Sequence, residues 1–309
     1  MLRRNFVKSA FATAGLSVGN ASLWANNSNV LPEKNSFKLN YAPHFGMFKN
    51  SAGDDLMAQL QFMADAGFMA LEDNEMMSRT VEVQTKIGEK LANLNMKMGV
   101  FVINSNGNWK TSLATGKQEF KDEFLKTCRT AVEVAKRCNA KYMTVVPGMF
   151  DRNIPIGIQT GHVIDALRQA AAIFEPHNLT MVLEPLSDTP DLFLRTSDQT
   201  YAICRAVNSP ACKLLFDMYH MQKNEGHLIH NINLTWDEIG YFQIGDNPGR
   251  NEPTTGEINY KNIFKHIYTK SKASNRSFIF GMEHGNAKAG KDGETALIRA
   301  YVESDAFVV

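Results

Sequence analysis

Met181-Val182-Leu183 running into Glu184 is the stretch that decides the fold, because the same arrangement recurs three more times in the chain. Each recurrence is a short apolar run that leads to a side chain with an oxygen: Leu214–Phe216 before Asp217, Tyr241–Phe242 before Gln243, and Phe278–Phe280 before Gly281, Met282 and Glu283. The four oxygen-bearing residues follow one another at 33, 26 and 40 positions, each near the length of one strand-plus-helix unit. In a parallel barrel, functional residues sit at these carboxyl ends of the strands. The pattern therefore predicts a barrel with a polar site at one end.

Eight apolar runs along the chain are typical of buried strands. They are Lys38–Ala42, Phe68–Leu71, Met96–Ile103, Tyr142–Val146, Leu179–Leu183, Lys213–Phe216, Gly240–Gln243 and Ser277–Gly281. The segments between them carry apolar residues at three- and four-residue spacing, which indicates amphipathic helices such as one from about Lys117 to Arg137. Alternating strands and helices over residues 38–309, without a linker, predict one α/β domain, a single (β/α)8 TIM barrel. A doubly wound open sheet is the alternative, but residues 42–46 lack the glycine-rich phosphate turn that normally follows its first strand.

The first 25 residues differ in character from the rest of the chain. Arg3-Arg4 with Phe6 precedes a weakly apolar stretch rich in Ala, Gly and Ser, which resembles a twin-arginine export signal. We therefore expect a signal peptide at residues 1–25, a flexible tether at 26–37, and a periplasmic protein. The alternative is an uncleaved basic start of a cytosolic enzyme. The apolar stretch is too short to anchor the chain across a bilayer, so no stable membrane insertion is expected.

The charge and cysteine content exclude several classes of partner. With 33 basic and 32 acidic residues, the chain gives no electrostatic reason to bind nucleic acid or an anionic membrane. Its four cysteines have neither zinc-finger nor redox spacing. We expect buried free thiols, and a Cys204–Cys212 pair is the alternative. A homo-oligomer is left open.

The four strand-end residues suit a metal site. Three carboxylates and one amide brought to one point would repel each other unless a cation neutralised them. Oxygen donors of this kind favour Mg²⁺ or Mn²⁺ over metals that prefer thiolate or imidazole. The sequence therefore predicts one divalent ion bound by Glu184, Asp217, Gln243 and Glu283. The alternative is that these are ordinary polar residues that close the strands.

Two further residues follow the same strand ends and are candidates for binding substrate oxygens. His220 comes three residues after Asp217, and Arg250 ends the polar loop that begins at Gln243. For His220, the alternative is a histidine satisfied by a backbone carbonyl. For Arg250, the alternative is a salt bridge to Glu252 or Asp246.

Several segments closely resemble the hydroxypyruvate isomerase family, which belongs to the xylose-isomerase-like barrels together with ketose 3-epimerases and inosose dehydratases. The segments are Glu184-Pro185-Leu186, Phe216–Gln222, Gln243–Pro253 and Gly256–Tyr260, and the resemblance runs from about Leu39 to the end of the chain. It implies one divalent ion on the four residues named above. It also implies that Glu184 and Glu283 are the acid–base pair and that His220 and Arg250 bind substrate.

The expected function is therefore a metal-dependent isomerase that interconverts a hydroxy-ketone and a hydroxy-aldehyde through an enediolate. Because Ser187-Asp188 stands where these isomerases usually have Asn, and because an export signal is foreign to them, the substrate is less defined than the chemistry. A ketose epimerase or an inosose dehydratase built on the same site is the alternative, as is a non-catalytic exported sugar-binding barrel. In each case the partner is a small hydroxy-carbonyl compound or sugar.

Overall fold

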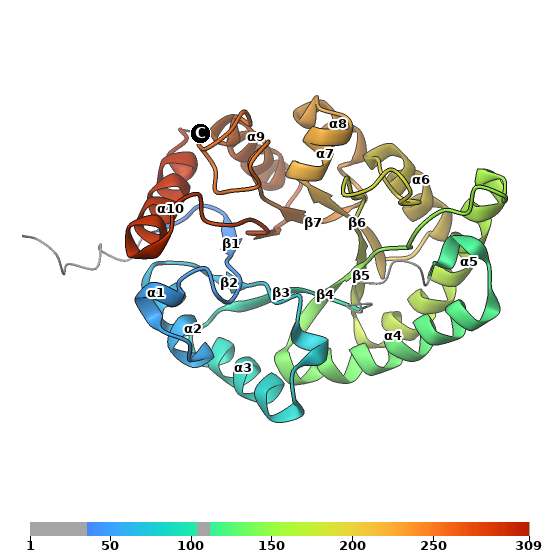
Figure 1. Ribbon diagram of the computed structural model, residues 1–309, viewed down its shortest axis with the longest axis horizontal. Coiled ribbons are helices and arrows are strands. Elements are labelled where there is room, and N and C mark those ends of the chain that lie inside the picture. The colour runs from blue at the N-terminus through green and yellow to red at the C-terminus, as the bar shows by residue number, and fades with distance from the viewer. Residues whose placement is uncertain (1–35, 104–111, 309) are drawn as a thin grey trace, which may run out of the picture. The chain divides into compact units, whose positions relative to one another are not determined.

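Parallel strands alternate with helices throughout the computed structural model, which describes residues 36–103 and 112–308 (Figure 1). The predicted signal peptide and residues 26–35 of the predicted tether lie outside these residues. The strands are β1 (Asn40–Ala42), β2 (Ala70–Leu71), β3 (Lys97–Val102), β4 (Ala140–Val145), β5 (Thr180–Leu183), β6 (Cys212–Asp217), β7 (Ile239–Gln243) and β8 (Ile279–Gly281). Each overlaps a predicted strand.

The eight strands form one sheet in the order β1-β8-β7-β6-β5-β4-β3-β2, with all neighbouring pairs parallel. Between β1 and β2 the described backbone forms one isolated parallel bridge, His44 with Glu72, in which Glu72 N donates to Pro43 O at 2.9 Å. The ring is therefore nearly closed, and it closes at the carboxyl ends of the strands. The predicted TIM barrel is confirmed.

Helices lie around the strands, as expected when an apolar stripe packs against a buried sheet (Figure 1). They are α1 (Lys49–Ala52), α2 (Leu56–Asp65), α3 (Val81–Asn93), α4 (Gln118–Cys138), α5 (Ile156–Phe174), α6 (Ser197–Val207), α7 (Met218–Asn224), α8 (Leu228–Thr235), α9 (Tyr260–Ala273) and α10 (Gly290–Asp305). Short 3₁₀ turns are η1 (Met76–Ser78), η2 (Leu113–Thr115) and η3 (Glu175–His177). The long helix predicted near Lys117–Arg137 is α4.

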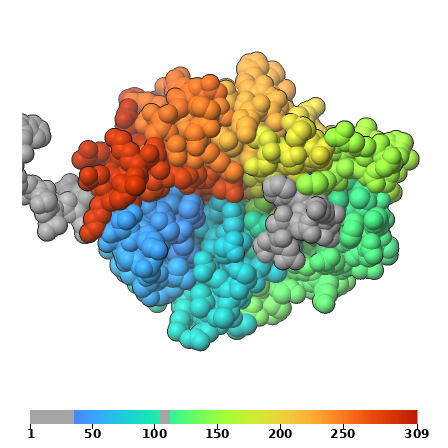
Figure 2. Space-filling model, in the orientation of Figure 1, coloured from blue at the N-terminus to red at the C-terminus, as the bar shows by residue number. Residues whose placement is uncertain are grey.

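The first and last parts of the described chain meet and complete the ring. The space-filling view shows the blue and red segments packed against each other (Figure 2). Asn50, in α1, donates through its backbone N to Glu294 Oε1 in α10 at 2.7 Å, and β1 pairs with β8. Among the described residues, no helix is long and apolar enough to cross a membrane.

A small apolar cluster fills the middle of the barrel, with one buried residue from each of seven strands: Ala42, Ala70, Val100, Val182, Leu215, Tyr241 and Ile279. Tyr241 is the largest of them. A Cβ on Gly99 of β3 would lie 2.4 Å from the Tyr241 hydroxyl oxygen, so a glycine is required where β3 passes this ring. The larger core lies between the sheet and the helices.

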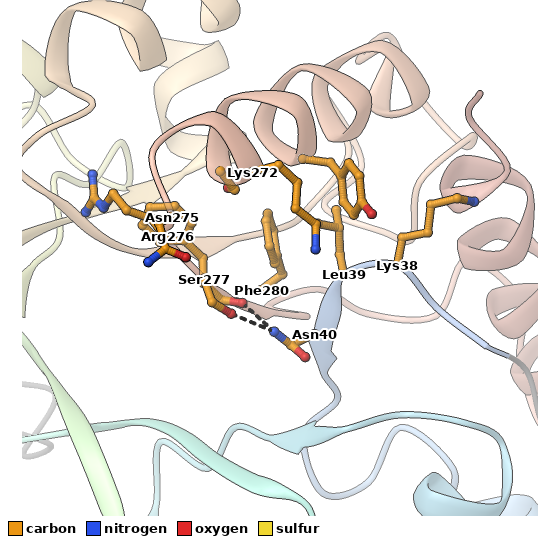
Figure 3. A pocket seen from close by; sticks show the side chains of 11 residues that line it. Lys38, Leu39, Asn40, Lys272, Asn275, Arg276, Ser277 and Phe280 are labelled. Atoms are coloured by element: carbon orange, nitrogen blue, oxygen red, sulfur yellow. Dashed lines mark hydrogen bonds between the residues drawn. The ribbon is translucent and has the colours of Figure 1, made fainter. Parts of the chain in front are cut away.

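The amino ends of β1 and β8 border a cavity of about 240 Å³ (Figure 3). Asn40 Nδ2 donates to Phe278 O at 3.0 Å and to Ser277 Oγ at 3.4 Å there, which ties the two strands together. In barrels of this type the amino end serves stability, and chemistry is found at the carboxyl end. The candidate site is therefore expected at the opposite end from this cavity.

Candidate active site at the carboxyl ends of the strands

Consecutive strands deliver the predicted ligands to one end of the barrel. Glu184 directly follows β5, Asp217 ends β6, Gln243 ends β7, and Glu283 comes two residues after β8. The register places Asp217 beside Gln243, and Gln243 beside Gly281. Ligand atoms of Glu184, Asp217, His220 and Glu283 all lie within 4.8 Å of one another. The structure thus brings three predicted ligands together with His220.

Asp217 has its two carboxylate oxygens in different surroundings because it also caps a helix. Its Oδ1 accepts from the backbone N of Tyr219 at 2.6 Å and of His220 at 3.2 Å, at the start of α7. The cap fixes the rotation of the carboxylate. The second oxygen, Oδ2, is left 3.7 Å from Arg250 Nη2 and 3.8 Å from His220 Nε2.

Three oxygens on three neighbouring strand ends are buried without a hydrogen-bond partner in the described part of the chain. They are Glu184 Oε1, Asp217 Oδ2 and Gln243 Oε1. Leaving a buried acceptor unpaired costs about 1–3 kcal/mol, so three together are a strong sign of an absent partner. Because all three are hard oxygen donors, the set fits a divalent cation of the Mg²⁺ or Mn²⁺ type.

The acids of the cluster also resist ionisation. Burial raises the pKa of Glu184 well above its usual value, and the charges of Glu283 and Asp217 raise it further. Burial likewise raises the pKa of Asp217 and of Glu283, although Arg250 opposes both shifts. One guanidinium is insufficient to offset three clustered carboxylates, and a bound cation would supply the remaining positive charge.

Arg250 is drawn to the carboxylate cluster. Its Nη2 donates to Glu283 Oε2 at 2.7 Å, its Nε donates to Glu283 O at 3.2 Å, and its guanidinium carbon lies 5.0 Å from the Tyr219 ring centre. Arg250 does not form the alternative salt bridge to Asp246 or Glu252. Those carboxylates instead accept backbone N–H groups of Gly256, Ile258 and Ala287 within the same group of loops.

His220 is fully buried, and a donor group approaches each nitrogen of its ring. The backbone N of Ser187 lies 3.1 Å and its Oγ 2.8 Å from Nδ1, and Arg250 Nη2 lies 3.2 Å from Nε2. Burial, followed by the charge of Arg250, lowers the pKa of His220 to about 4, so the ring is neutral. A neutral imidazole carries one proton and accepts at one nitrogen, so these two contacts do not fix the tautomer, and the ring remains a candidate metal ligand.

Two residues of the site were not singled out in the sequence, and both follow β2. Glu72 is buried, and it accepts from Gln243 Nε2 at 2.9 Å and from the Tyr241 hydroxyl at 3.0 Å. Asn74 Nδ2 donates to Glu283 Oε1 at 3.1 Å. Glu72 directly follows the apolar run Phe68–Leu71, so the rule that identified the other four would also have found it.

Comparison with known proteins agrees with this geometry. The family described as xylose isomerase-like TIM barrel matches residues 60–300. The chain belongs to this family. Hydroxypyruvate isomerase from Escherichia coli (strain K12) is 28% identical over 244 residues, which cover 75% of this chain and 87% of that protein.

Two further similar proteins support different conclusions. A 2-oxo-tetronate isomerase from Cupriavidus necator is 30% identical over 145 residues, or 46% of this chain and 56% of that protein. The crystal structure of an AP endonuclease, family 2, from Brucella melitensis has a TM-score of 0.70 at 22% identity, covering 82% of this chain and 96% of that one. At this identity the structural match supports the barrel fold alone.

Proposed function

We propose that this member of the xylose isomerase-like family is a metal-dependent isomerase that interconverts a hydroxy-ketone and a hydroxy-aldehyde bearing a carboxylate, as in hydroxypyruvate. The observation that carries the proposal is the set of three unpartnered buried oxygens on β5, β6 and β7. The relatives named hydroxypyruvate isomerase and 2-oxo-tetronate isomerase support an isomerase at about 30% identity.

Glu184, Asp217, Gln243 and Glu283 would hold the metal. A divalent ion held there would neutralise the carboxylates and would supply Lewis-acid polarisation of a carbonyl. Mg²⁺ and Mn²⁺ are the ions that this set of oxygen donors favours.

Glu184 and Glu283 exchange protons with carbon. Their surroundings indicate which of them removes a proton from the substrate. No described residue donates a hydrogen bond to Glu184 Oε1, so this oxygen is free to take a proton. Both Glu283 oxygens already accept, from Arg250 and Asn74. Glu184 is therefore the base that removes the proton next to the carbonyl, giving an enediolate. Return of a proton to the adjacent carbon completes the isomerisation.

Arg250 and His220 bind the substrate oxygens. Arg250 Nη2 and His220 Nε2 lie 3.2 Å apart, and both lie within 4 Å of Asp217 Oδ2. A substrate oxygen beside them would accept from the guanidinium, and also from the ring when Nε2 carries the proton. A guanidinium also binds a carboxylate through two parallel hydrogen bonds, and both hydroxypyruvate and 2-oxo-tetronate carry that group. The acid–base pair alone does not separate isomerisation from epimerisation or dehydration, since these differ in the pose of the substrate.

We also propose that the protein is exported to the periplasm by the twin-arginine route. The support is the Arg3-Arg4 pair with Phe6 and the weakly apolar stretch behind it.

The decisive experiment is hydrogen exchange in D₂O. The Mn²⁺- or Mg²⁺-loaded protein is incubated with hydroxypyruvate, ketoses and inososes, and each product is examined for deuterium at each carbon. We expect deuterium at the carbon next to the carbonyl of hydroxypyruvate, and none with a Glu184→Gln control. Exchange confined to ketoses or inososes would indicate an epimerase or a dehydratase, and not the proposed isomerase. Absence of exchange with any compound would favour the sugar-binding barrel.

A further inference from the structure

We propose that Glu72 is a positioning residue that fixes the side-chain amide of Gln243, so that the Gln243 oxygen is presented to the metal site. The proposal rests on the proposed function, because it assigns a purpose to Glu72 only if Gln243 is a ligand. Gln243 comes from β7 and Glu72 follows β2, and 171 positions separate them in the chain.

The contacts determine which end of the Gln243 amide faces Glu72. A carboxylate accepts hydrogen bonds, so the Gln243 end that lies 2.9 Å from Glu72 Oε1 is the NH₂ group. The other end of the amide, Oε1, is buried and has no partner among the described residues. Without Glu72, the amide could rotate and turn its NH₂ group toward the carboxylates, which would remove an oxygen ligand.

Tyr241 holds Glu72 from the other side. Its hydroxyl donates to Glu72 Oε2 at 3.0 Å, and both Tyr241 and Gln243 belong to β7, two residues apart on the same face of the strand. One strand therefore provides a donor to each oxygen of Glu72. The carboxylate is held at two points and cannot rotate freely, so the orientation of Gln243 is fixed as well.

The absence of a side chain at Gly281 leaves space for the Glu72 carboxylate. A Cβ on Gly281 of β8 would lie 1.7 Å from Glu72 Oε2 and 3.1 Å from Gln243 Cγ. Any larger residue at position 281 would displace the acid. The barrel interior next to Glu72 is an apolar cluster, so burying an acid here costs folding free energy. A functional role would explain why the acid is present.

The alternative is that Glu72 only stabilises the fold, and Glu238 is a matched control for that case. Glu238 is also a buried glutamate next to β7, but it precedes the strand and pairs with Lys213 at 2.6 Å and with Arg205 at 3.1 Å. Its removal costs stability at the amino end of the strand, away from Gln243.

The experiment measures Mn²⁺ affinity of the full chain by the electron paramagnetic resonance signal of free Mn²⁺. For Glu72→Leu we expect a loss of affinity on the order of 10- to 100-fold, as is typical for residues that orient metal ligands. Glu72→Gln should stay close to the wild-type affinity, because its amide oxygen can still accept from Gln243. Glu238→Leu should lower the melting temperature and leave the affinity unchanged.

A charge exchange keeps the test valid if Glu72→Leu does not fold. Gln243→Glu alone places two carboxylates face to face and should weaken Mn²⁺ binding. Combining it with Glu72→Gln restores one donor and one acceptor with their roles exchanged, so the double variant should bind Mn²⁺ more tightly than Gln243→Glu alone. Equal or weaker binding by the double variant would overturn the proposal.

Asp217→Asn separates the two proposals, because this residue is a predicted ligand that does not contact Glu72. If it weakens Mn²⁺ binding while Glu72→Leu does not, the role of Glu72 is overturned and the metal site stands. If Asp217→Asn leaves binding unchanged, the metal site itself is wrong and the role of Glu72 is overturned with it.

Discussion

Arg250 Nη2 lies 2.7 Å from Glu283 Oε2, so the guanidinium of one candidate substrate-binding residue pairs with one candidate metal ligand. The same Nη2 atom is 3.7 Å from Asp217 Oδ2. Arg250 thus carries the positive charge closest to this acid group within the described residues. On the proposed function, a substrate carboxylate that competes for the guanidinium would free Glu283 for its proposed roles. The pairing would then link substrate binding to the availability of Glu283.

Metal binding should stabilise the folded protein, because the unpaired oxygens and the acids are brought together only when the barrel is formed. Mn²⁺ at one hundred times its dissociation constant should add about 2.7 kcal/mol to the free energy of unfolding. Thermal unfolding with added Mn²⁺, with Mg²⁺ and with EDTA measures this. The Gln243→Ala variant should need more metal for the same shift. A melting temperature that is indifferent to metal and chelator would contradict the metal site.

Glu184→Gln and Glu283→Gln should each reduce turnover by a factor on the order of 10²–10⁴. Each variant keeps an oxygen donor of similar size, so metal affinity should weaken without being abolished. Each also removes a group that can exchange a proton with carbon. Steady-state rates at saturating Mn²⁺, set against the Mn²⁺ affinity of each variant, test this. Turnover that returns to the wild-type rate at high Mn²⁺ would assign these residues to metal binding alone.

The strand ends could be predicted because one local rule produced them: a buried apolar run followed by an oxygen-bearing residue. This rule placed Glu184, Asp217, Gln243 and Glu283 at one end of the barrel, and it applies equally to Glu72, which was not singled out. The short strand β2, of two residues, gave a weaker signal than β6 or β7.

Other features of the site arise from contacts between distant residues, which no local pattern reveals. His220 Nδ1 meets the backbone N of Ser187, 33 positions away, and Arg250 meets Glu283 across the same separation. The free oxygen of Asp217 could be anticipated only by knowing that the other oxygen caps α7. Sequence therefore predicted which residues gather, and the structure determines which atoms face the site.

The cysteines should be unreactive in the folded protein. All four are free and buried. Burial raises the pKa of Cys128 to about 12 and that of Cys138 to about 11, so the reactive thiolate is scarce at pH 8. Titration with a thiol reagent at pH 8 should proceed slowly for the native protein and rapidly in denaturant, where four thiols per chain should react. Two thiols per chain would instead indicate the Cys204–Cys212 disulfide.

Export should depend on the paired arginines if the proposed signal is correct. Replacing Arg3 and Arg4 with lysine keeps the charge but removes the guanidinium pair that the twin-arginine receptor reads. We expect the variant to remain in the cytoplasm and to keep its N-terminal segment, as measured by fractionation and mass spectrometry. The unaltered chain, expressed in parallel, is the control. Equal recovery of both proteins from the periplasm would show that the signal was misidentified.

Arg250→Ala should raise KM most for substrates that carry a carboxylate. A hydrogen bond to a charged group contributes about 1.5–3 kcal/mol, so the KM for hydroxypyruvate should rise roughly 10- to 100-fold. Loss of Arg250 also removes the positive charge that lowers the pKa of Glu283, and this change should alter kcat for all substrates alike. The ratio of KM values for carboxylate and neutral substrates therefore isolates the binding role.

Two control variants accompany this test. Arg250→Lys retains the charge without the two-pronged geometry and should give an intermediate KM. Arg205→Ala, at an exposed arginine away from the site, should leave KM unchanged. An equal rise in KM for neutral sugars and for carboxylates would remove the main physical support for a hydroxypyruvate-type substrate and would favour a sugar isomerase or epimerase.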